Sequence, residues 1–405
     1  MVNLKKIYIY LVFISLCLSN ETEYVIPLHT GFNLVSFYAL PEDYSLDNIL
    51  YPISETISCI SSGTSSGYYK NGIWSGSLID MNLYSGYWIN MNANGELIIN
   101  GEGIDINRTY NIAEGNNLIS FPAPDVVSVD LGMLNDSEHN IHSIIGEGVA
   151  AKFIDNKWIG SLKQFEGTRG YWVNSTREFN FNFHIDTTHS SNRKQNPYIA
   201  EMVPERFLHE PSAKQAFYFI DGISLSEFTI EKGDWIISYC NDNITGARVW
   251  LEETVDIPVF GDDGRLSTKD YCIQNDIPEF KLFKTKTGTL ISLDSKTPPW
   301  KPNGIFYLGK LNEKQVIPKF IQLQKIYPNP FNPVTNIDYS VVDNGYISLI
   351  IYDLLGQEIA VLQDGFQNMG LHTLEWDAST FPSGGYYIQL TAGDVQSTKK
   401  LMLVK

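Results

Sequence analysis

One stretch of the chain occurs twice at a constant spacing of 84 residues (115 − 31, 158 − 74 and 170 − 86). GFNLVSF at 31–37 returns as GNNLISF at 115–121, WSGSL at 74–78 returns as WIGSL at 158–162, and GYWIN at 86–90 returns as GYWVN at 170–174. Three matches in one register predict two copies of a small unit rather than a long solenoid. We therefore place a first repeat at residues 24–105 and a second repeat at residues 106–185.

The pattern inside each repeat is that of a β protein. The NLVSF and GYWIN segments and their copies are predicted as strands, with a short helix near Ser45–Leu50 and near Ser128–Leu134. Across the chain, 43% hydrophobic residues with 13% aromatics argue for packed cores, and Gly- and Pro-rich turns separate the short runs. We expect a mainly β protein that consists of several small β-sandwich or barrel domains in tandem.

Two tryptophans, Trp74 and Trp158, stand at the same place in the two repeats, each ahead of a small turn. Flat aromatic rings stack on the apolar faces of sugar rings, so both are candidates for glycan binding. The alternative is that they fill a core, as large aromatics commonly do in small β domains. The repeats resemble a duplicated module of secreted bacterial proteins, with a GWNLIS-like opening and a GYWV-like close, and this resemblance implies no catalytic residue.

Residues 186–212 are polar and weakly patterned and are predicted as a linker, while 213–312, the middle module, is predicted as a β-sandwich. The middle module is similar to an extracellular β module of other secreted bacterial proteins. Its acidic loops could bind calcium, with Asp262, Asp263 and Asp270 as the candidate ligands. Because GDDGRLSTKD lacks the D-x-[DN]-x-[DN]-G spacing, solvated turn carboxylates are the alternative, and no other cofactor is expected.

The N-terminus has the pattern of a secretory signal peptide, residues 1–19. Lys5 and Lys6 precede an apolar stretch of 12 residues, Ile7–Leu18, which is shorter than the ~20 residues of a bilayer-spanning helix. Its removal leaves Cys59, Cys240 and Cys272. Cys240 and Cys272 lie in one module and could form a disulfide in an oxidising compartment, whereas Cys59 is expected to be a buried free thiol.

The net charge argues against nucleic-acid binding, and the motifs searched for point to no known class of enzyme. The net charge of −17 opposes binding to phosphate backbones, so no nucleic acid partner is expected. HExxH, GxSxG, P-loop and Cys/His zinc patterns are absent from the sequence. We expect no catalytic residues, although a pair of glycosidase-type carboxylates cannot be recognised from spacing alone.

The last 80 residues begin with a stiff, turn-rich entry. Pro328, Pro330 and Pro333 fix the backbone and lack donors for a ladder, while Asn329 and Asn332 favour turns around Phe331. Alternating strands follow, with Gly356 and Gly385 at tight turns and Lys405 at the end. This pattern predicts a small immunoglobulin-like sandwich at 326–405 after a linker at 313–325.

These blocks, from YPNPFNP through LIIYDLLGQEI and SGGYYIQL to STKKLMLVK, resemble the type A C-terminal sorting domain of the type IX secretion system. The resemblance implies export by the general secretory route and then passage across the outer membrane of a Gram-negative bacterium related to the Bacteroidetes. It also implies the secretion machinery and a sortase as partners. The sortase would cut between Leu311 and Tyr327, leaving a cargo that is released or attached to surface lipopolysaccharide.

We expect a secreted or cell-surface protein whose cargo binds an extracellular glycan or protein, as an adhesin does. A secreted hydrolase and a structural surface-layer component are the alternatives.

Overall fold

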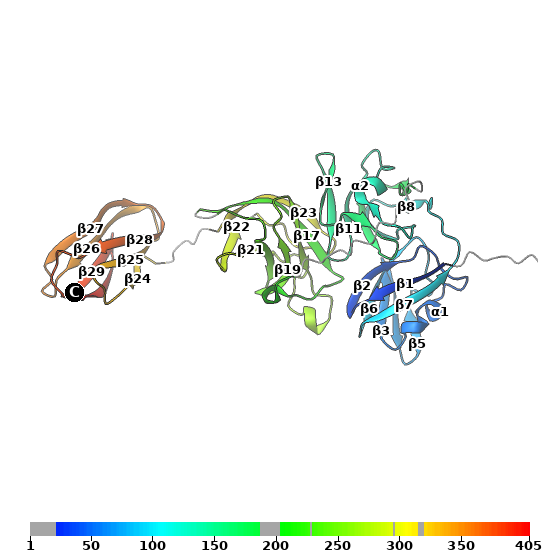
Figure 1. Cartoon of the computed structure of the whole chain (residues 1–405), viewed down its shortest axis with the longest axis horizontal. Helices are drawn as coiled ribbons and strands as arrows, with labels where there is room; N and C mark the ends of the chain where they lie inside the picture. The colour runs from blue at the N-terminus through cyan, green and yellow to red at the C-terminus, as the bar shows by residue number, and fades with distance from the viewer. Residues whose placement is uncertain (1–21, 187–202, 227–228, 295, 315–319) are drawn as a thin grey trace, which may run out of the picture. The chain divides into compact units, whose positions relative to one another are not determined.

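The structure is a computed structural model that describes residues 22–186, 203–226, 229–294, 296–314 and 320–405. The predicted signal peptide and most of the predicted linker at 186–212 lie outside these residues. The chain is mainly β, as predicted, and none of the described helices is long and apolar enough to cross a membrane. Contacts divide the chain into two compact units, Met1–Glu313 and Lys314–Lys405 (Figure 1).

The first repeat contains a five-stranded sheet of order β2-β6-β3-β4-β5 and a separate β1-β7 pair. The elements are β1 (Thr22–Leu28), β2 (Gly31–Ser36), α1 (Leu46–Leu50), η1 (Tyr51–Ile53), β3 (Ile57–Ser62), β4 (Ser65–Lys70), β5 (Ile73–Gly76), β6 (Gly86–Met91) and β7 (Gly95–Gly101). Helix α1 begins at Ser45, whose hydroxyl accepts a hydrogen bond from the Asn48 N–H, because this side chain satisfies a free donor of the first turn.

The second repeat has the same strand order. Its five-stranded sheet runs β9-β15-β11-β12-β13, beside the pairs β8-β16 and β10-β14. The elements are β8 (Tyr110–Ile112), β9 (Gly115–Ile119), β10 (Val127–Ser128), α2 (Val129–Gly132), β11 (Ile141–Ile145), β12 (Ala150–Ile154), β13 (Lys157–Gly160), β14 (Gln164–Phe165), β15 (Tyr171–Ser175) and β16 (Phe179–Phe181).

The contacts between the two repeats are reciprocal. The Ser36 N–H donates to the Thr168 carbonyl at 3.1 Å, and the equivalent Ser120 N–H donates to the Tyr84 carbonyl at 3.0 Å. At Gly170 the copies are so close that an added Cβ would lie 2.8 Å from a backbone oxygen of the first repeat. The repeats therefore pack as a pseudo-symmetric pair within one chain.

The middle module is one seven-stranded sheet of order β19-β18-β21-β22-β23-β17-β20, where we predicted a two-sheet sandwich. Its elements are η3 (Glu205–Phe207), β17 (Gln215–Ser224), β18 (Trp235–Cys240), β19 (Asn243–Val249), β20 (Val255–Phe260), η4 (Leu266–Thr268), β21 (Glu279–Lys284), β22 (Thr289–Asp294) and β23 (Ile305–Glu313). The sheet curls so that its edge strand β20 approaches β18 and the opposite edge strand β19, and side chains bond across this gap. Ser238 Oγ donates to the Pro258 carbonyl at 2.8 Å, and Arg248 Nε donates to the Asp256 carbonyl at 3.1 Å.

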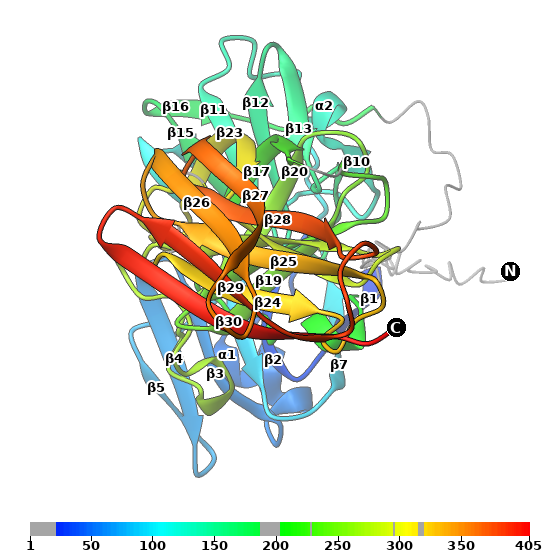
Figure 2. The same ribbon diagram turned by 90° about the vertical axis from the view of Figure 1, so that its left-hand side faces the viewer.

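The second unit is a sandwich of two antiparallel sheets, β24-β25-β28 and β27-β26-β29-β30 (Figure 2). Its strands are β24 (Gln322–Tyr327), β25 (Val334–Val341), β26 (Gly345–Tyr352), β27 (Glu358–Gln367), β28 (Gly370–Asp377), β29 (Gly384–Ala392) and β30 (Val395–Leu403). Both sheets bury side chains in a shared core that includes Leu349, Trp376 and Ile388. Strand β24 begins at Gln322, inside the segment that we predicted as a linker.

Candidate ligand-binding site

A pocket of about 250 Å³ lies where the second repeat meets the edge strands of the middle module. The loop after β11, the segment before β17, and strands β18, β19 and β20 form its walls. The lining residues are Glu147, Gly148, Val203, Leu208, His209, Pro211, Trp235, Ala247, Arg248, Pro258 and Phe260. Concave, mostly apolar pockets at module boundaries, with a few converging polar groups, are the usual place for a small ligand.

Glu147 ties the pocket wall to the first repeat. Its carboxylate accepts a hydrogen bond from His29 Nε2 at 2.5 Å and one from the Leu34 N–H at 2.9 Å, and it pairs with Arg169 at 3.5 Å. The hydrogen bond to Glu147 raises the pKa of His29 above its ordinary value, with burial opposing it. The carboxylate is thus held in one orientation by contacts from both repeats.

Arg248 and Asp256 join the middle module to the second repeat at the pocket. Arg248 donates to the Gly148 carbonyl at 3.0 Å and pairs with Asp256 at 3.4 Å. The buried Asp256 carboxylate also accepts from the Ser161 N–H at 2.8 Å, the Ser161 hydroxyl at 2.6 Å and the Ala150 N–H at 3.2 Å. Burial raises the pKa of Asp256, while Arg248 and the Ser161 donors oppose that rise.

His209 supplies a neutral polar group. Burial lowers the pKa of its imidazole, and Nδ1 lies 3.0 Å from the Phe207 carbonyl oxygen. Since a carbonyl only accepts, Nδ1 carries the proton and Nε2 is an acceptor in the neutral ring. The ring centroid lies 5.6 Å from that of Phe260, so imidazole and phenyl form adjoining parts of the wall.

The two predicted tryptophans occupy equivalent positions. Trp74 lies on β5 with its ring centroid 5.0 Å from that of Tyr69, and Trp158 lies on β13 at 5.3 Å from Phe153. Both are partly buried against the core of their own repeat. Each therefore presents only part of its ring to solvent, and neither lines the pocket.

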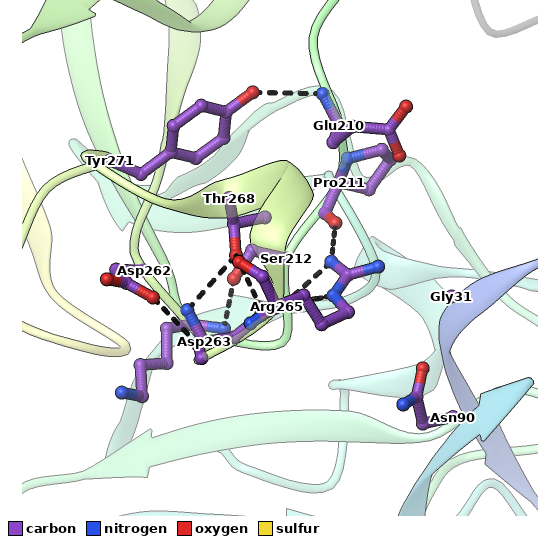
Figure 3. A network of polar contacts seen from close by, with 12 residues as sticks. Gly31, Asn90, Glu210, Pro211, Ser212, Asp262, Asp263, Arg265, Thr268 and Tyr271 are labelled. Atoms are coloured by element: carbon purple, nitrogen blue, oxygen red, sulfur yellow. Dashed lines mark hydrogen bonds and ion pairs between the residues drawn. The ribbon is translucent and has the colours of Figure 1, made fainter. Parts of the chain in front are cut away.

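Two of the three predicted calcium ligands, Asp262 and Asp263, accept hydrogen bonds from neighbouring residues through their carboxylates (Figure 3). Asp263 is nearly buried and accepts from the Arg265 guanidinium at 2.7 Å and from the Thr268 hydroxyl at 2.6 Å. Asp262 accepts from the Gly264 N–H at 2.7 Å, and Asp270 offers its backbone carbonyl to two asparagine side chains. In the described part of the chain, no three His, Cys, Asp or Glu residues are grouped so that they could hold a metal ion.

Arg265 serves as a contact between modules. Its guanidinium lies 5.2 Å from the centroid of the Phe32 ring on β2 and also donates to the Pro211 carbonyl beside the pocket. A cation over an aromatic ring is attracted by the negative face of the ring. The loop that contains Asp262 and Asp263 therefore holds Arg265, which contacts the first repeat.

The disulfide suggested by the sequence is present, whereas the free Cys59 is half-buried and not buried as predicted. Cys240 at the end of β18 and Cys272 form a disulfide with a Cα–Cα distance of 5.4 Å. Cys59 on β3 is free and half-buried, and burial raises the pKa of its thiol, which keeps the thiol protonated at neutral pH.

The predicted sorting motif forms one edge of the sandwich. Phe331 is buried 5.3 Å from the Trp376 ring, and its N–H and C=O pair with the Met402 C=O and Val404 N–H of the last segment. Asn329 bonds the backbone of Lys400 and Met402 through its side chain, and the carbonyls of Pro328 and Pro333 accept from Thr335 and Ala378. Pro330 and Asn332 flank Phe331, and Gly356 adopts φ +80° in a turn, as predicted. Gly385 was predicted at a tight turn, but it lies buried on β29, where it pairs with Met402. Lys405 Nζ donates to the Ser379 carbonyl at 2.6 Å.

The pocket residues were missed in the sequence because no motif connects them. Glu147, His209, Trp235, Arg248 and Phe260 come from five separate segments. The local sequence around Trp235 and Phe260 has a strand-like pattern, which predicts strands but gives no sign of a pocket.

Two solved structures to which the chain is similar share few residues with it. The chain is similar to dimeric latent PorU from Porphyromonas gingivalis at 9% identity and a TM-score of 0.19, covering 95% of this chain and 30% of that one. It is similar to the TIE protein of Bacillus anthracis at 8% identity and a TM-score of 0.15, covering 96% of this chain and 69% of that one. No curated protein matches the chain.

The family comparison concerns the second unit. Residues 325–405 match the family described as secretion system C-terminal sorting domain. The match covers β25 to β30 and the edge motif around Phe331, in agreement with the resemblance seen in the sequence. The C-terminal sandwich is therefore a type IX secretion sorting domain, which directs the chain to the cell surface or the medium of a Gram-negative bacterium.

Proposed function

We propose that the exported cargo, residues 22–313, is a glycan-binding adhesin and that the pocket beside Glu147 holds one sugar ring. The observation that carries the proposal is the combination of aromatic walls, Trp235 and Phe260, with three polar groups, Glu147, His209 and Arg248. Aromatic rings provide flat apolar area, and the polar groups can orient hydroxyls.

The size of the pocket supports a single ring. Its volume of about 250 Å³ falls below the roughly 300–1,000 Å³ of pockets for drug-sized ligands. The walls are braced by Asp256 and by the Glu147–His29 contact, so the polar groups are held in place before a ligand arrives.

Binding is favoured over hydrolysis. Glycosidases that use two carboxylates need both beside the scissile bond. Glu147 is the single carboxylate among the described lining residues, and it is bonded to His29. A secreted hydrolase would instead release reducing ends from the glycan that it binds.

The test is an array of bacterial, algal and host polysaccharides probed with the full chain and with Leu208→Trp. Leu208 lines the pocket and is 64% exposed, so a bulkier ring there closes the entrance without disturbing a core. We expect selective binding by the parent chain and a glycan affinity that is at least about tenfold lower for L208W. Leu290→Trp, at a position on β22 that is 46% exposed and outside the pocket lining, is the matched control.

A blank array, or equal binding by L208W and the parent, would contradict the proposal. Self-assembly of the parent chain without glycan binding would favour a surface-layer component instead.

The same array tests the earlier candidates. Trp74→Ala and Trp158→Ala measure whether the exposed parts of those rings take part in binding. Repeating the array with a chelator tests calcium at Asp262, Asp263 and Asp270, where an ion would have to displace Arg265 from Asp263.

We further propose a sortase and surface lipopolysaccharide as partners, to be tested by locating the mature chain in cell fractions.

A further inference from the structure

Two histidines at the pocket need opposite protonation states, and the contacts of their rings show which state each needs. His209 lines the pocket itself, and His29 of the first repeat bonds Glu147 of the pocket wall. A ring nitrogen that carries a proton donates a hydrogen bond, and one without a proton accepts. The partners of both nitrogens therefore fix the charge of each ring.

His29 has an acceptor at both ring nitrogens. Nδ1 lies 2.8 Å from the Thr30 carbonyl oxygen, and Nε2 lies 2.5 Å from the Glu147 carboxylate. Because both oxygens only accept, the two contacts form together only when the ring carries two protons and a positive charge. A neutral ring gives up one of the two contacts, and in either tautomer the attraction of opposite charges between His29 and Glu147 is lost.

The charged groups around His29 favour this positive ring. Glu147 is the carboxylate that faces it, and Arg169 of the second repeat pairs with Glu147 at 3.5 Å. Arg265 of the middle module lies beside β2, where Asp263 neutralises it. The hydrogen bond to Glu147 is the largest effect and raises the pKa of His29, while burial and Arg169 oppose the rise.

His209 has the opposite requirement. Nδ1 donates to the Phe207 carbonyl, which leaves Nε2 as the acceptor of a neutral ring. The charged groups around it are Glu210, the next residue, and Arg248 on β19, which pairs with Asp256 on β20. Burial lowers the pKa of His209, and Arg248 acts in the same direction, whereas Phe207 and Glu210 oppose it. A proton on Nε2 would replace an acceptor by a donor.

We propose that the pocket binds a sugar ring best while His29 is charged and His209 is neutral, so that glycan binding rises and then falls as the pH increases. This inference rests on the proposed function and adds the regulation of the same site by pH. The charged His29 holds the Glu147 carboxylate in place as an acceptor for sugar hydroxyls, and the neutral His209 offers Nε2 as a second acceptor.

The sign of each change gives the two sides of the pH profile. As the pH rises through the raised pKa of His29, the ring loses its charge and Glu147 loses a partner that fixes it. As the pH falls through the lowered pKa of His209, Nε2 gains a proton and stops accepting. One pKa lies above the ordinary histidine value of about 6.5 and the other lies below it, so we expect maximal binding at about pH 6.5.

The experiment is affinity electrophoresis of the full chain in gels that contain laminarin, galactomannan, xyloglucan or alginate, from about pH 5 to about pH 9. None of these polysaccharides titrates in that range, so a pH profile reports on the protein. His29→Lys keeps a positive charge beside Glu147 across the range, and His209→Gln keeps an acceptor without titrating. His372→Gln, in the sorting domain and outside the pocket lining, is the matched control.

We expect the parent chain to bind at least one polysaccharide about tenfold more tightly at about pH 6.5 than at either end, because a polar contact is lost on each side. H29K should keep tight binding at the alkaline end and lose it at the acid end. H209Q should do the reverse, and H372Q should follow the parent. Each variant thus retains one side of the profile, and circular dichroism of each variant reports its folding.

Nitrogen-15 NMR of the histidine rings in the unliganded parent chain tests the protonation states without a glycan. At about pH 6.5 we expect a mainly charged His29 and a mainly neutral His209 with its proton on Nδ1. A neutral His29, a charged His209, or binding that stays constant across the pH range would refute this inference and leave the proposed function standing. If no polysaccharide retards the parent at any pH, the proposed function and this inference both fail.

Discussion

Replacement of Asp256 by asparagine tests whether the second repeat and the middle module form one structural unit. The Asp256 carboxylate, 1% exposed, lies between Arg248 of its own module and two residues of the second repeat, Ala150 and Ser161. Each of these partners donates a hydrogen bond to it. The asparagine side chain of D256N would keep one acceptor oxygen but would direct an NH2 group toward donors.

The magnitude follows from the contacts that are lost. A hydrogen bond to a charged group contributes about 1.5–3 kcal/mol, and breaking one side of a buried ion pair costs about 3–5 kcal/mol. We therefore expect D256N to reduce the free energy of unfolding of residues 22–313 by about 3–5 kcal/mol, against a total of roughly 5–15 kcal/mol for a typical domain.

Urea unfolding of the full chain at pH 7, followed by tryptophan fluorescence, measures this change, because seven of the eight tryptophans precede residue 314. The control is Asp221→Asn, since Asp221 accepts from Thr254 and Tyr307 at an exposed site, where such contacts are worth up to about 1 kcal/mol. The S161A/D256N double-mutant cycle should show coupling. A loss below about 1 kcal/mol for D256N would refute the view that this carboxylate joins the two modules.

Three further predictions concern other contacts. Glu147 raises the pKa of His29, so their contact stabilises the fold fully below the unfolded pKa of about 6.5, and this stabilisation is lost as the pH rises through the folded pKa. In E147Q, the midpoint of the His29 titration, measured by NMR, should shift to lower pH. An unchanged midpoint would contradict this prediction. Reduction of the Cys240–Cys272 disulfide, which closes a separation of 32 residues, should lower the free energy of unfolding by about 3–4 kcal/mol. Thermal unfolding with and without reductant measures this loss, and the control variant C240A/C272A should show no difference between the two conditions. Phe331→Ala should destabilise the sorting domain by about 3–5 kcal/mol and retain the chain inside the cell, and normal amounts of F331A in the medium or on the surface would show that its packing is dispensable.

Much of the fold was predictable because its signals are local. The NLVSF and GYWIN segments form β2 and β6 and pair directly, as Leu34 with Trp88 shows. Ser45 begins α1 as its capping chemistry suggests. The sorting domain was recognisable because Phe331 and its flanking residues form a compact run, in which backbone geometry and a single buried ring fix the edge of the sandwich.

The candidate sites were not predictable for the opposite reason. Asp263 looks like a free carboxylate in the sequence, and only the fold shows that Arg265 occupies it while reaching Phe32 in another module. Similarly, Ser61 and Ile145 hold the same place in two copies, yet the sequence does not say which copy contacts β17.

The sequence by itself determined the strands, the duplicated pattern and the C-terminal sorting domain, since each depends on residues that are near neighbours along the chain. The tertiary structure decided the pocket that Glu147 and Phe260 line and the partners of Asp262 and Asp263. These depend on side chains brought together from distant segments, whose packing is set by the sum of many weak contacts rather than by any local pattern.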